Sequence, residues 1–314
     1  MASETFEQFM QRCLHDPKRG YYARNIRSIG ARGDFTTAPQ LSDIPAKAIS
    51  RWAKLAMKNS KTHNLIELGP GLGTLSKQVV KYMPLLDRLK TQLHLVESSP
   101  ALREQQRRTL GKRAQIHADI HSALDACSGN AVIFSNELVD AFPVRLFQKT
   151  ENAWLEVTVE KSQDIIRENF ITPLALPESS IFDVKHPVGQ RVEIHESYHR
   201  WLKGWLPMWQ RGELLTIDYG NTAEHIYTRR PQGTVRGFLM HQRTEGLEIY
   251  QNQGLQDLTA DVNFTDLCRW GENWLTQNEL KNFADFIKPF CSEHELPLLS
   301  ACEHFFCLHQ SRRN

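Results

Sequence analysis

A glycine-rich loop follows the first short apolar run of the sequence. Residues 65–68 lead into Gly69, Gly71 and Gly73, and Thr74 then opens an amphipathic stretch of helical character. Glycines let the backbone turn sharply and approach a ligand closely, and the open amides of a helix start favour a negative or strongly polar group. The loop therefore predicts a nucleotide-like ligand. A turn with a purely structural role is the alternative, since Gly-rich turns after strands have many causes.

The spacing of the glycines indicates which nucleotide this is. The dinucleotide fingerprint G-x-G-x-x-G would place its third glycine at position 74, but that residue is Thr74 and the glycine is Gly73. A phosphate loop would need a lysine directly after the last glycine, and none follows Gly73. With Glu67 two residues before the first glycine and Pro70 inside the loop, the segment is similar to the first motif of S-adenosylmethionine (SAM)-dependent methyltransferases. That cofactor has no pyrophosphate to hold.

Two acidic residues follow the next apolar runs. Glu97 ends the run at residues 93–96, 24 residues beyond Gly73, where α/β nucleotide sites keep a carboxylate for the ribose hydroxyls. Asp119 follows a short run, where methyltransferases often contact the adenine amino group. It could equally cap the helix that follows, and both interpretations of Asp119 stay open.

Short apolar runs alternate with longer amphipathic stretches along the chain. The runs are residues 65–68, 93–96, 131–134 and 214–217. Such alternation is typical of βαβ units and predicts an α/β fold with a mostly parallel sheet covered on both faces. In such sheets ligands bind at the carboxyl ends of the strands, so we expect the functional residues just after each run.

Three segments do not fit this alternation. Residues 1–60 include a helix-like stretch at 6–14 and a Gly/Pro-punctuated loop, and about 80 residues separate the runs at 131–134 and 214–217, far more than one connection needs. We predict an N-terminal cap (1–60), a core (61–150 and 211–314) and a substrate-recognition insertion (151–210). The glycine-containing stretch at 221–261 is irregular and predicts a lid.

Motifs along most of the chain match a single family in order and spacing. The matching segments are residues 16–17, 20–22, 33–39, 67–75, 95–100, 135–144, 217–220, 233–236, His241 and residues 257–264. In these segments the sequence resembles the MidA family of SAM-dependent methyltransferases, which includes the mitochondrial complex I assembly factor with protein-arginine methyltransferase activity. The resemblance implies a Rossmann-like class I methyltransferase sheet with an N-terminal helical cap and a large insertion, and SAM as the cofactor.

Two segments depart from the family pattern. Members usually follow the loop at 33–39 with Ser-Gln-x-Phe-Gly, whereas residues 40–45 read Gln-Leu-Ser-Asp-Ile-Pro here. The family's D-L-T-x-x-V-D-F carries Asn263 in place of its second aspartate. Both departures lie in loops expected to contact the substrate, and the cofactor loop keeps the family pattern.

Polar residues after the run at 131–134 suit an arginine acceptor. Asn136, Glu137 and Asp140 would lie where the methyl group points, and if a short helix follows, Glu137 and Asp140 share a face. A guanidinium presents its donors as a planar fork, so carboxylates can orient one nitrogen toward the methyl group. Glu137 is the predicted clamp and Asp140 the second candidate, with helix capping and surface exposure as alternatives. Asp34, counted with the cofactor-binding residues, and Asp218 either line the same cleft or stabilise turns.

Two other functions compete with arginine methylation. Residues 135–137 lie where amino-group methylases keep Asn or Asp before Pro-Pro and an aromatic residue, so a nucleobase or small molecule is an alternative acceptor, although those prolines and the ring are missing. The second alternative is a SAM-binding assembly factor or scaffold with little turnover, because a fold does not establish a function.

Charge and composition indicate the class of protein and its partners. The 314 residues carry a formal charge of +2 and 40% hydrophobic residues, which argues against a protein that mainly neutralises nucleic-acid phosphates. The basic run from Arg103 to Arg113 has helical spacing and predicts a solvated helix face. No window resembles a membrane span or a signal core, so we expect a soluble, cytoplasmic protein without membrane insertion. The family implies a protein substrate, for example a respiratory NADH dehydrogenase subunit.

The cysteines are scattered and indicate a reducing compartment rather than a disulfide or zinc framework. Four of the residues that crowd the tail are Cys302, His304, Cys307 and His309. If residues 298–309 form a terminal strand, the first two face one side and the last two the other, so four ligands cannot converge. We therefore expect no metal site.

Overall fold

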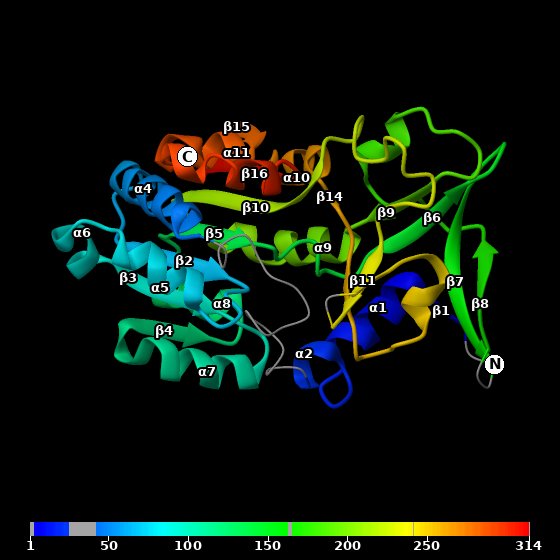
Figure 1. Ribbon diagram of the computed structural model, residues 1–314, viewed down its shortest axis with the longest axis horizontal. Coiled ribbons are helices and arrows are strands. Elements are labelled where there is room, and N and C mark those ends of the chain that lie inside the picture. The colour runs from blue at the N-terminus through cyan, green and yellow to red at the C-terminus, as the bar shows by residue number, and fades with distance from the viewer. Residues whose placement is uncertain (1–2, 25–41, 163–164, 241, 314) are drawn as a thin grey trace. The chain divides into compact units, whose positions relative to one another are not determined.

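The computed structural model describes residues 3–24, 42–162, 165–240 and 242–313 (Figure 1). Its contacts divide the chain into two compact units. The sheet unit takes the described parts of residues 29–138, 203–219 and 271–314, and the accessory unit takes those of residues 1–28, 139–202 and 220–270.

The sheet unit is built on seven strands of a mixed sheet. In spatial order they are β4 (Ala114–His117), β3 (Gln92–Val96), β2 (Asn64–Leu68), β5 (Val132–Asn136), β10 (Glu213–Asn221), β16 (Phe305–Arg312) and β15 (Leu275–Asn282). The first five run parallel, β16 is antiparallel to β10, and β15 is antiparallel to β16. The parallel α/β arrangement predicted from the four apolar runs is confirmed.

The sheet unit also contains helices, most of which bury apolar side chains. They are α4 (Ile44–Asn59), α5 (Thr74–Lys81), α6 (Leu85–Lys90), α7 (Pro100–Leu110), α8 (Ile120–Ala126), α11 (Phe283–Ile287) and α12 (Leu298–Ala301). The apolar face of α4 packs with α5 and with the central strands around Phe134 and Ile217, because burying one face of each helix stabilises both layers. Within the described ranges, no helix combines the length and apolar character needed to cross a membrane.

The accessory unit has its own sheets and its own core. Strand β7 (Trp154–Ser162) pairs antiparallel with β1 (Ser3–Thr5), β6 (Arg145–Lys149) and β8 (Ile165–Ile171), and β6 pairs with β9 (Arg191–Ile194). A second sheet has the order β12 (Gln242–Thr244), β11 (Arg236–Leu239), β13 (Asp257–Thr259). Helix α1 (Phe6–His15) starts with a capping box of Thr5 and Gln8, and Phe6 and Phe9 pack against Tyr250.

Short elements complete the described chain. They are α2 (Tyr21–Arg24), α9 (Glu196–Trp205), α10 (Phe264–Gly271), β14 (Val262–Asn263), and the 3₁₀ turns at Gly111–Arg113, Ser180–Asp183, Leu206–Met208, Gly246–Tyr250, Lys288–Phe290 and Glu293–Glu295. The division into two units differs from the predicted bounds at residues 60, 150 and 210, because α4 packs on the large sheet while residues 3–24 pack in the accessory unit. A substrate-recognition role for residues 151–210 stays a prediction.

Two expectations about local structure are wrong. Residues 298–309 do not form one strand: they contain α12 and then β16, which begins only at Phe305. Cys302 and His304 therefore precede the strand, and the face argument built on them does not apply. The stretch at 221–261 is not wholly irregular, since it contains the three strands of the smaller sheet. Its alternation is short and interrupted by glycines, which hides strands of three or four residues.

Candidate functional site

The glycine loop lies at the carboxyl end of β2 in a backbone conformation that needs glycine. Gly69 has φ +63° and donates its amide to the Val96 carbonyl at 3.0 Å. A Cβ on Gly69 would lie 2.6 Å from Leu138 Cδ1, so the glycine loop packs directly against the loop that follows β5. Gly73, with φ +74°, precedes α5, and a Cβ there would lie 3.1 Å from Leu110 Cδ1. Both positions favour glycine through conformation and space together.

Two buried side chains hold the glycine loop from neighbouring elements. Gln106 of α7 donates through Nε2 to the Gly71 carbonyl at 2.6 Å. Its Oε1 is buried and has no hydrogen-bond partner among the described residues. Glu97, at the end of β3, accepts hydrogen bonds from the amides of Gly71 and Ser99. Burial raises the pKa of Glu97 to about 7, against the lowering effect of these amides. A buried carboxylate with spare acceptor capacity therefore adjoins the glycine loop.

The sequence did not indicate Gln106. It occupies the buried face of α7 together with Leu102, four residues earlier, and its side chain is fully buried. A polar residue in the apolar stripe of an otherwise basic helix was the available signal, because buried amides require a partner. The predicted solvated face of the same helix is confirmed at Arg107 and Arg108, which are exposed.

Glu67 lies beneath the loop. Its side chain is 2% exposed and accepts hydrogen bonds from the hydroxyl and the amide of Ser76 in α5. Burial raises the pKa of Glu67 to about 7. These contacts tie the end of β2 to the first turn of the following helix. A direct contact of Glu67 with the cofactor stays a prediction, as do those of Gly71 and Pro70.

Asp119 follows β4 at the same edge of the sheet. It is the N-cap of α8, where Oδ1 accepts from the Ser122 amide at 2.9 Å. This hydrogen bond is the main reason why the pKa of Asp119 is lowered. The capping interpretation is therefore observed, and a contact with an adenine amino group stays a prediction.

The loop after β5 is fixed by the neighbouring strand. The Glu137 amide donates to the Ile217 carbonyl at 3.0 Å, and the Leu138 amide donates to Asp218 Oδ2 at 3.1 Å. Asn136 donates through Nδ2 to Glu137 Oε1 at 3.0 Å. Glu137 has φ +52°, a conformation that costs a non-glycine residue about 1–3 kcal/mol and concentrates at functional sites. The structure thus brings Asn136, Glu137 and Asp218 together beside the glycine loop.

The short helix expected after β5 is absent: in the described chain, residues 137–140 form bends and a turn. The positive φ of Glu137 and the bond from Leu138 to Asp218 take the backbone out of a helical path. Glu137 and Asp140 therefore do not share a helix face. Glu137 belongs to the sheet unit and Asp140 to the accessory unit, and their joint action on one guanidinium stays a prediction.

Asp140 is a buried residue of the accessory unit. Its Oδ2 accepts from the Thr259 hydroxyl at 2.8 Å, and burial raises the pKa of the Asp140 carboxyl. Its backbone carbonyl accepts from the Ala260 amide at 3.1 Å. Neither alternative made for Asp140, helix capping or surface exposure, describes it. Asp34 and the motif at residues 33–39 lie outside the described residues.

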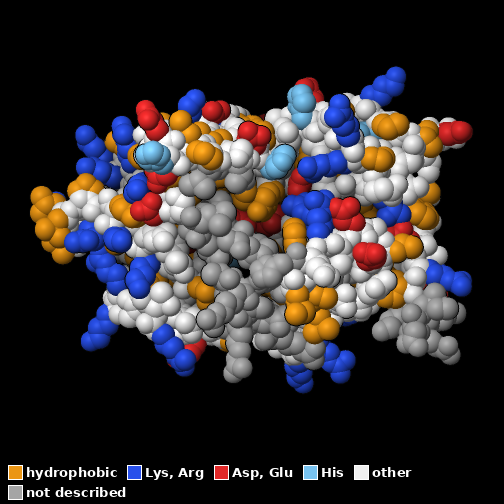
Figure 2. Space-filling view, viewed as in Figure 1, with side chains coloured by type: hydrophobic (Ala, Val, Ile, Leu, Met, Phe, Trp, Pro, Cys, Tyr) orange, Lys and Arg blue, Asp and Glu red, His pale blue; other side chains and the backbone are white. Residues whose placement is uncertain are grey.

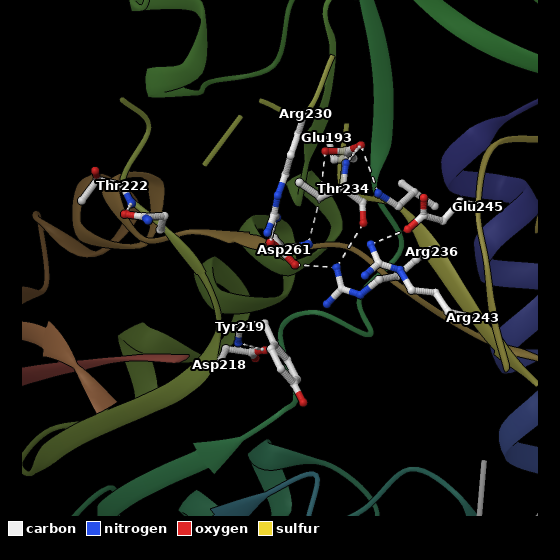
Figure 3. A network of polar contacts seen from close by, with 12 residues as sticks. Glu193, Asp218, Tyr219, Thr222, Arg230, Thr234, Arg236, Arg243, Glu245 and Asp261 are labelled. Carbon is white, nitrogen blue, oxygen red and sulfur yellow. Dashed lines mark hydrogen bonds and ion pairs between the residues drawn. The ribbon is translucent and has the colours of Figure 1, made fainter. Parts of the chain in front are cut away.

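A polar network in the accessory unit includes several residues that carry the family resemblance (Figure 3). Asp261 binds both Arg230 and Arg236, the latter at 2.5 Å. Glu193 accepts from the Thr234 amide at 2.8 Å and from its hydroxyl at 3.0 Å. A Cβ at position 233 would overlap Glu193 Oε1, which accounts for a glycine there. Because these residues bind partners within their own unit, a structural role explains why they carry the family pattern.

Asn263, which departs from the family pattern, also has a structural explanation. Its Nδ2 donates to Ser180 Oγ at 3.0 Å, and that hydroxyl donates to Asp266 at 2.6 Å. An aspartate at position 263 could not donate to this hydroxyl, since an ionised carboxylate only accepts. The amide therefore fits a site where Asp266 already supplies the carboxylate.

Comparisons with known proteins agree with this geometry. Residues 46–280 match the family described as "Putative S-adenosyl-L-methionine-dependent methyltransferase". The protein arginine methyltransferase NDUFAF7 of Danio rerio is 31% identical over 83% of this chain and 66% of its own length, and that of Homo sapiens is 28% identical over 85% and 65%. The chain thus spans slightly less than two thirds of these relatives.

A solved structure gives the same fold. A candidate methyltransferase of Burkholderia thailandensis, crystallised with S-adenosylhomocysteine, superposes with a TM-score of 0.77 at 24% identity, covering 99% of this chain and 88% of the other. The match of the family description to three quarters of the residues decides the membership. The chain belongs to the MidA family of SAM-dependent methyltransferases.

Proposed function

We propose that this protein is a SAM-dependent methyltransferase with a Rossmann-like class I core, acting on an arginine side chain of a protein. The strand order of the sheet unit supports the core assignment: five parallel strands, with the glycine loop after β2 in the middle, and an antiparallel β16 beside β10. Parallel sheets of this kind bind ligands where the strand order reverses, at the carboxyl ends of the strands.

The residues around the glycine loop fit SAM. The loop carries no lysine for a phosphate, and SAM has no phosphate to hold. Glu97 would accept hydrogen bonds from the ribose hydroxyls, and the unpartnered Oε1 of Gln106 can accept another. Binding hydroxyl donors stabilises the ionised form of Glu97, so the pKa that burial raises would fall when the cofactor binds.

One observation carries the proposal: the acidic loop at residues 136–138 packs against the glycine loop, with Leu138 filling the space beside Gly69. In the reaction, the methyl carbon leaves a sulfonium sulfur, which keeps the electron pair, and bonds to a guanidinium nitrogen, which loses a proton. Glu137 would orient the guanidinium through its carboxylate and accept that proton. Asp218 holds the backbone that carries Glu137. Positioning of this kind accounts for much of the rate enhancement in such displacements.

The names of the relatives support an arginine acceptor, since each is called a protein arginine methyltransferase. By the same relationship, we propose a respiratory NADH dehydrogenase subunit as one candidate substrate, with Asp140 as a second carboxylate for it. A cytoplasmic location stays part of the proposal.

Incubation with methyl-labelled SAM and an extract of the source cells tests this function. We expect label in protein, sensitive to protease and recovered as methylarginine on hydrolysis. The Glu137→Gln variant should bind SAM normally but transfer label poorly, while Glu104→Gln, an exposed change on α7, serves as the matched control. Label in nucleic acid or a small molecule would reassign the acceptor. SAM binding without any labelled product would instead support a scaffold.

A further inference from the structure

Three leucines of α6 face solvent. Leu85, Leu86 and Leu89 are 60%, 72% and 67% exposed, and no residue of this helix is buried. Single exposed leucines are ordinary on protein surfaces, but three within five residues form a contiguous apolar surface. In Figure 2 an orange group lies at the left of the view, where Figure 1 places α6, with blue side chains next to it.

The fold does not need these leucines for packing. Helix α6 is held by backbone bonds from Arg88 to the Pro84 carbonyl at 2.9 Å and from Thr91 to the Asp87 carbonyl at 2.9 Å. Asp87 also binds Lys54 at 3.1 Å, and Arg113 donates to the Arg88 carbonyl. Polar contacts therefore fix the helix to its unit, while its apolar side chains point elsewhere.

The surroundings of α6 are strongly basic. Residues 77–113 contain nine Lys and Arg against three Asp and Glu, although the whole chain carries only +2. Two of the three acids are paired, Asp87 with Lys54 and Glu104 with Arg107 and Arg108, and Glu97 is buried. The exposed cations of this segment are Lys77, Lys81, Lys90, Arg107, Arg108, Lys112 and Arg113. Of these cations, Lys90 belongs to α6 itself and Arg113 donates to the Arg88 carbonyl, so exposed positive charge adjoins the three leucines.

We propose that the α6 patch (Leu85, Leu86, Leu89, Arg88, Lys90 and Arg113) docks on an anionic lipid surface. Such a surface offers both things that the patch lacks in water: an apolar boundary for the leucines and negative headgroups for the cations. A nucleic acid would supply the phosphates but no apolar phase, and no base-stacking aromatic residue belongs to α6. The docking is peripheral, and it is independent of the methyl transfer proposed above.

Vesicle sedimentation with the full chain tests this docking. We expect the protein to sediment with vesicles of phosphatidylcholine mixed with phosphatidylglycerol, to stay in solution with phosphatidylcholine alone, and to be released by high salt. The combined change Leu85→Ser, Leu86→Ser and Leu89→Ser should weaken the partition coefficient at least about tenfold. Lys90→Glu with Lys112→Glu should weaken it similarly and reduce its salt dependence.

A matched control uses leucines that are equally exposed outside the basic segment. Leu174 and Leu247 are 109% and 66% exposed, and changing both to serine should leave sedimentation unchanged. Thermal unfolding and SAM binding of every variant check that the fold persists. Absence of sedimentation, equal sedimentation with both vesicle types, or equal losses in the control and α6 variants would each overturn the proposal. Capture of a duplex DNA or an acidic protein without vesicle binding would also overturn it.

Discussion

Asp261 of the accessory unit and two buried carboxylates of the sheet unit, Glu67 and Glu97, respond differently to burial. In the accessory unit, burial acts to raise the pKa of Asp261, but Arg236 and Arg230 outweigh it and hold the pKa below its usual value. In the sheet unit, burial raises the pKa of Glu67 and of Glu97 to about 7; Glu67 has no ion pair among the described residues, and the lowering effect of Arg103 on the pKa of Glu97 does not offset burial. A buried carboxylate that forms ion pairs within its own unit has a role in stabilising the fold. A buried carboxylate at the end of a parallel strand whose pKa stays raised is better explained by ligand binding.

The same comparison applies to the loops. Glu193 and Gly233 form a closed set of contacts inside the accessory unit. In the large sheet, by contrast, the strained Glu137 follows β5, and the next residue, Leu138, lies against Gly69 at the end of the neighbouring strand β2. Burial and charge alone therefore do not identify a functional site. Backbone strain and a buried carboxylate with a raised pKa, both at the ends of parallel strands, do so.

The largest expected effect is on the free energy of unfolding, in a residue outside the candidate site. Asp261→Asn would leave Arg236, whose side chain is 9% exposed, without its carboxylate. Breaking such a buried pair costs about 3–5 kcal/mol, which denaturant unfolding would measure. Asp183→Asn is the control, since its partner Arg269 and Asp183 itself are 47% and 64% exposed, and such pairs contribute about 0–1 kcal/mol. Equal losses of unfolding free energy in the two variants would show that the buried ion pair stabilises the fold no more than the exposed one.

A change in the glycine loop should act on binding. Gly69→Ala places a Cβ 2.6 Å from Leu138 Cδ1 at φ +63°, which should distort both loops. Strain of about 1–3 kcal/mol corresponds to a loss of roughly 10–100-fold in SAM affinity, measurable by calorimetry. Gly111→Ala also changes a glycine of positive φ, +55°, but nothing lies within 4 Å of its Cβ. It should keep its affinity for SAM, and an equal loss there would show that backbone conformation alone matters.

Asp218 should affect turnover more than cofactor binding. Its two oxygens accept from the amides of Leu138 and Tyr219 at 3.1 Å and 2.9 Å. In Asp218→Asn only one position can accept, so one amide loses its partner at a cost of about 1–2 kcal/mol. We expect kcat to fall about tenfold with little change in the KM for SAM. A rise in the KM for SAM at unchanged kcat would place Asp218 in cofactor binding instead.

A further prediction concerns pH. Because the pKa of Glu97 is raised from 4.5 to about 7 in the fold, the folded state holds its proton more tightly than the unfolded chain. Its contribution to stability therefore decreases as pH rises from about 4.5 to about 7. SAM affinity should change in the opposite direction, rising toward pH 7 and above as the carboxylate ionises.

Calorimetry with SAM and thermal unfolding at several pH values should both show these slopes for Glu97. In the Glu97→Gln variant, the part of the pH dependence that Glu97 contributes to stability and to SAM affinity should disappear. This variant should also bind SAM more weakly at pH 8. A pH-independent affinity in the native protein would separate Glu97 from the ribose.

The sequence predicted the sheet unit better than the accessory unit. Apolar runs buried on both faces read directly as strands: β2 and β3 lie within one residue of the expected ranges, and β5 within two. Strand β15 is mostly polar and lies at the sheet edge, so its pattern gave no strand signal. Strands of the accessory unit form antiparallel pairs, and the register of pairs such as β1 with β7 depends on partners distant in sequence.

For the site, motifs predicted which loops meet but not how they are held. Glycine spacing indicated the loop after β2, and acidic residues indicated the ends of β3 and β5. The hydrogen bonds from Gln106 to the glycine loop and from Ser76 to Glu67 depend on how side chains of different elements pack together. A local stretch of sequence does not encode that packing. The helix expected after β5 is absent for a similar reason: the Leu138 amide donates to Asp218, a residue distant in sequence, and this bond helps to fix the turn.

The central claim is that the loop after β2 holds a sulfonium nucleoside. Titration calorimetry of the full chain with S-adenosylmethionine, S-adenosylhomocysteine and NADH tests it most directly. We expect saturable binding of both adenosyl ligands, weakened in Gly69→Ala, and no binding of NADH. Tight binding of NADH with no heat from either adenosyl ligand would contradict the account.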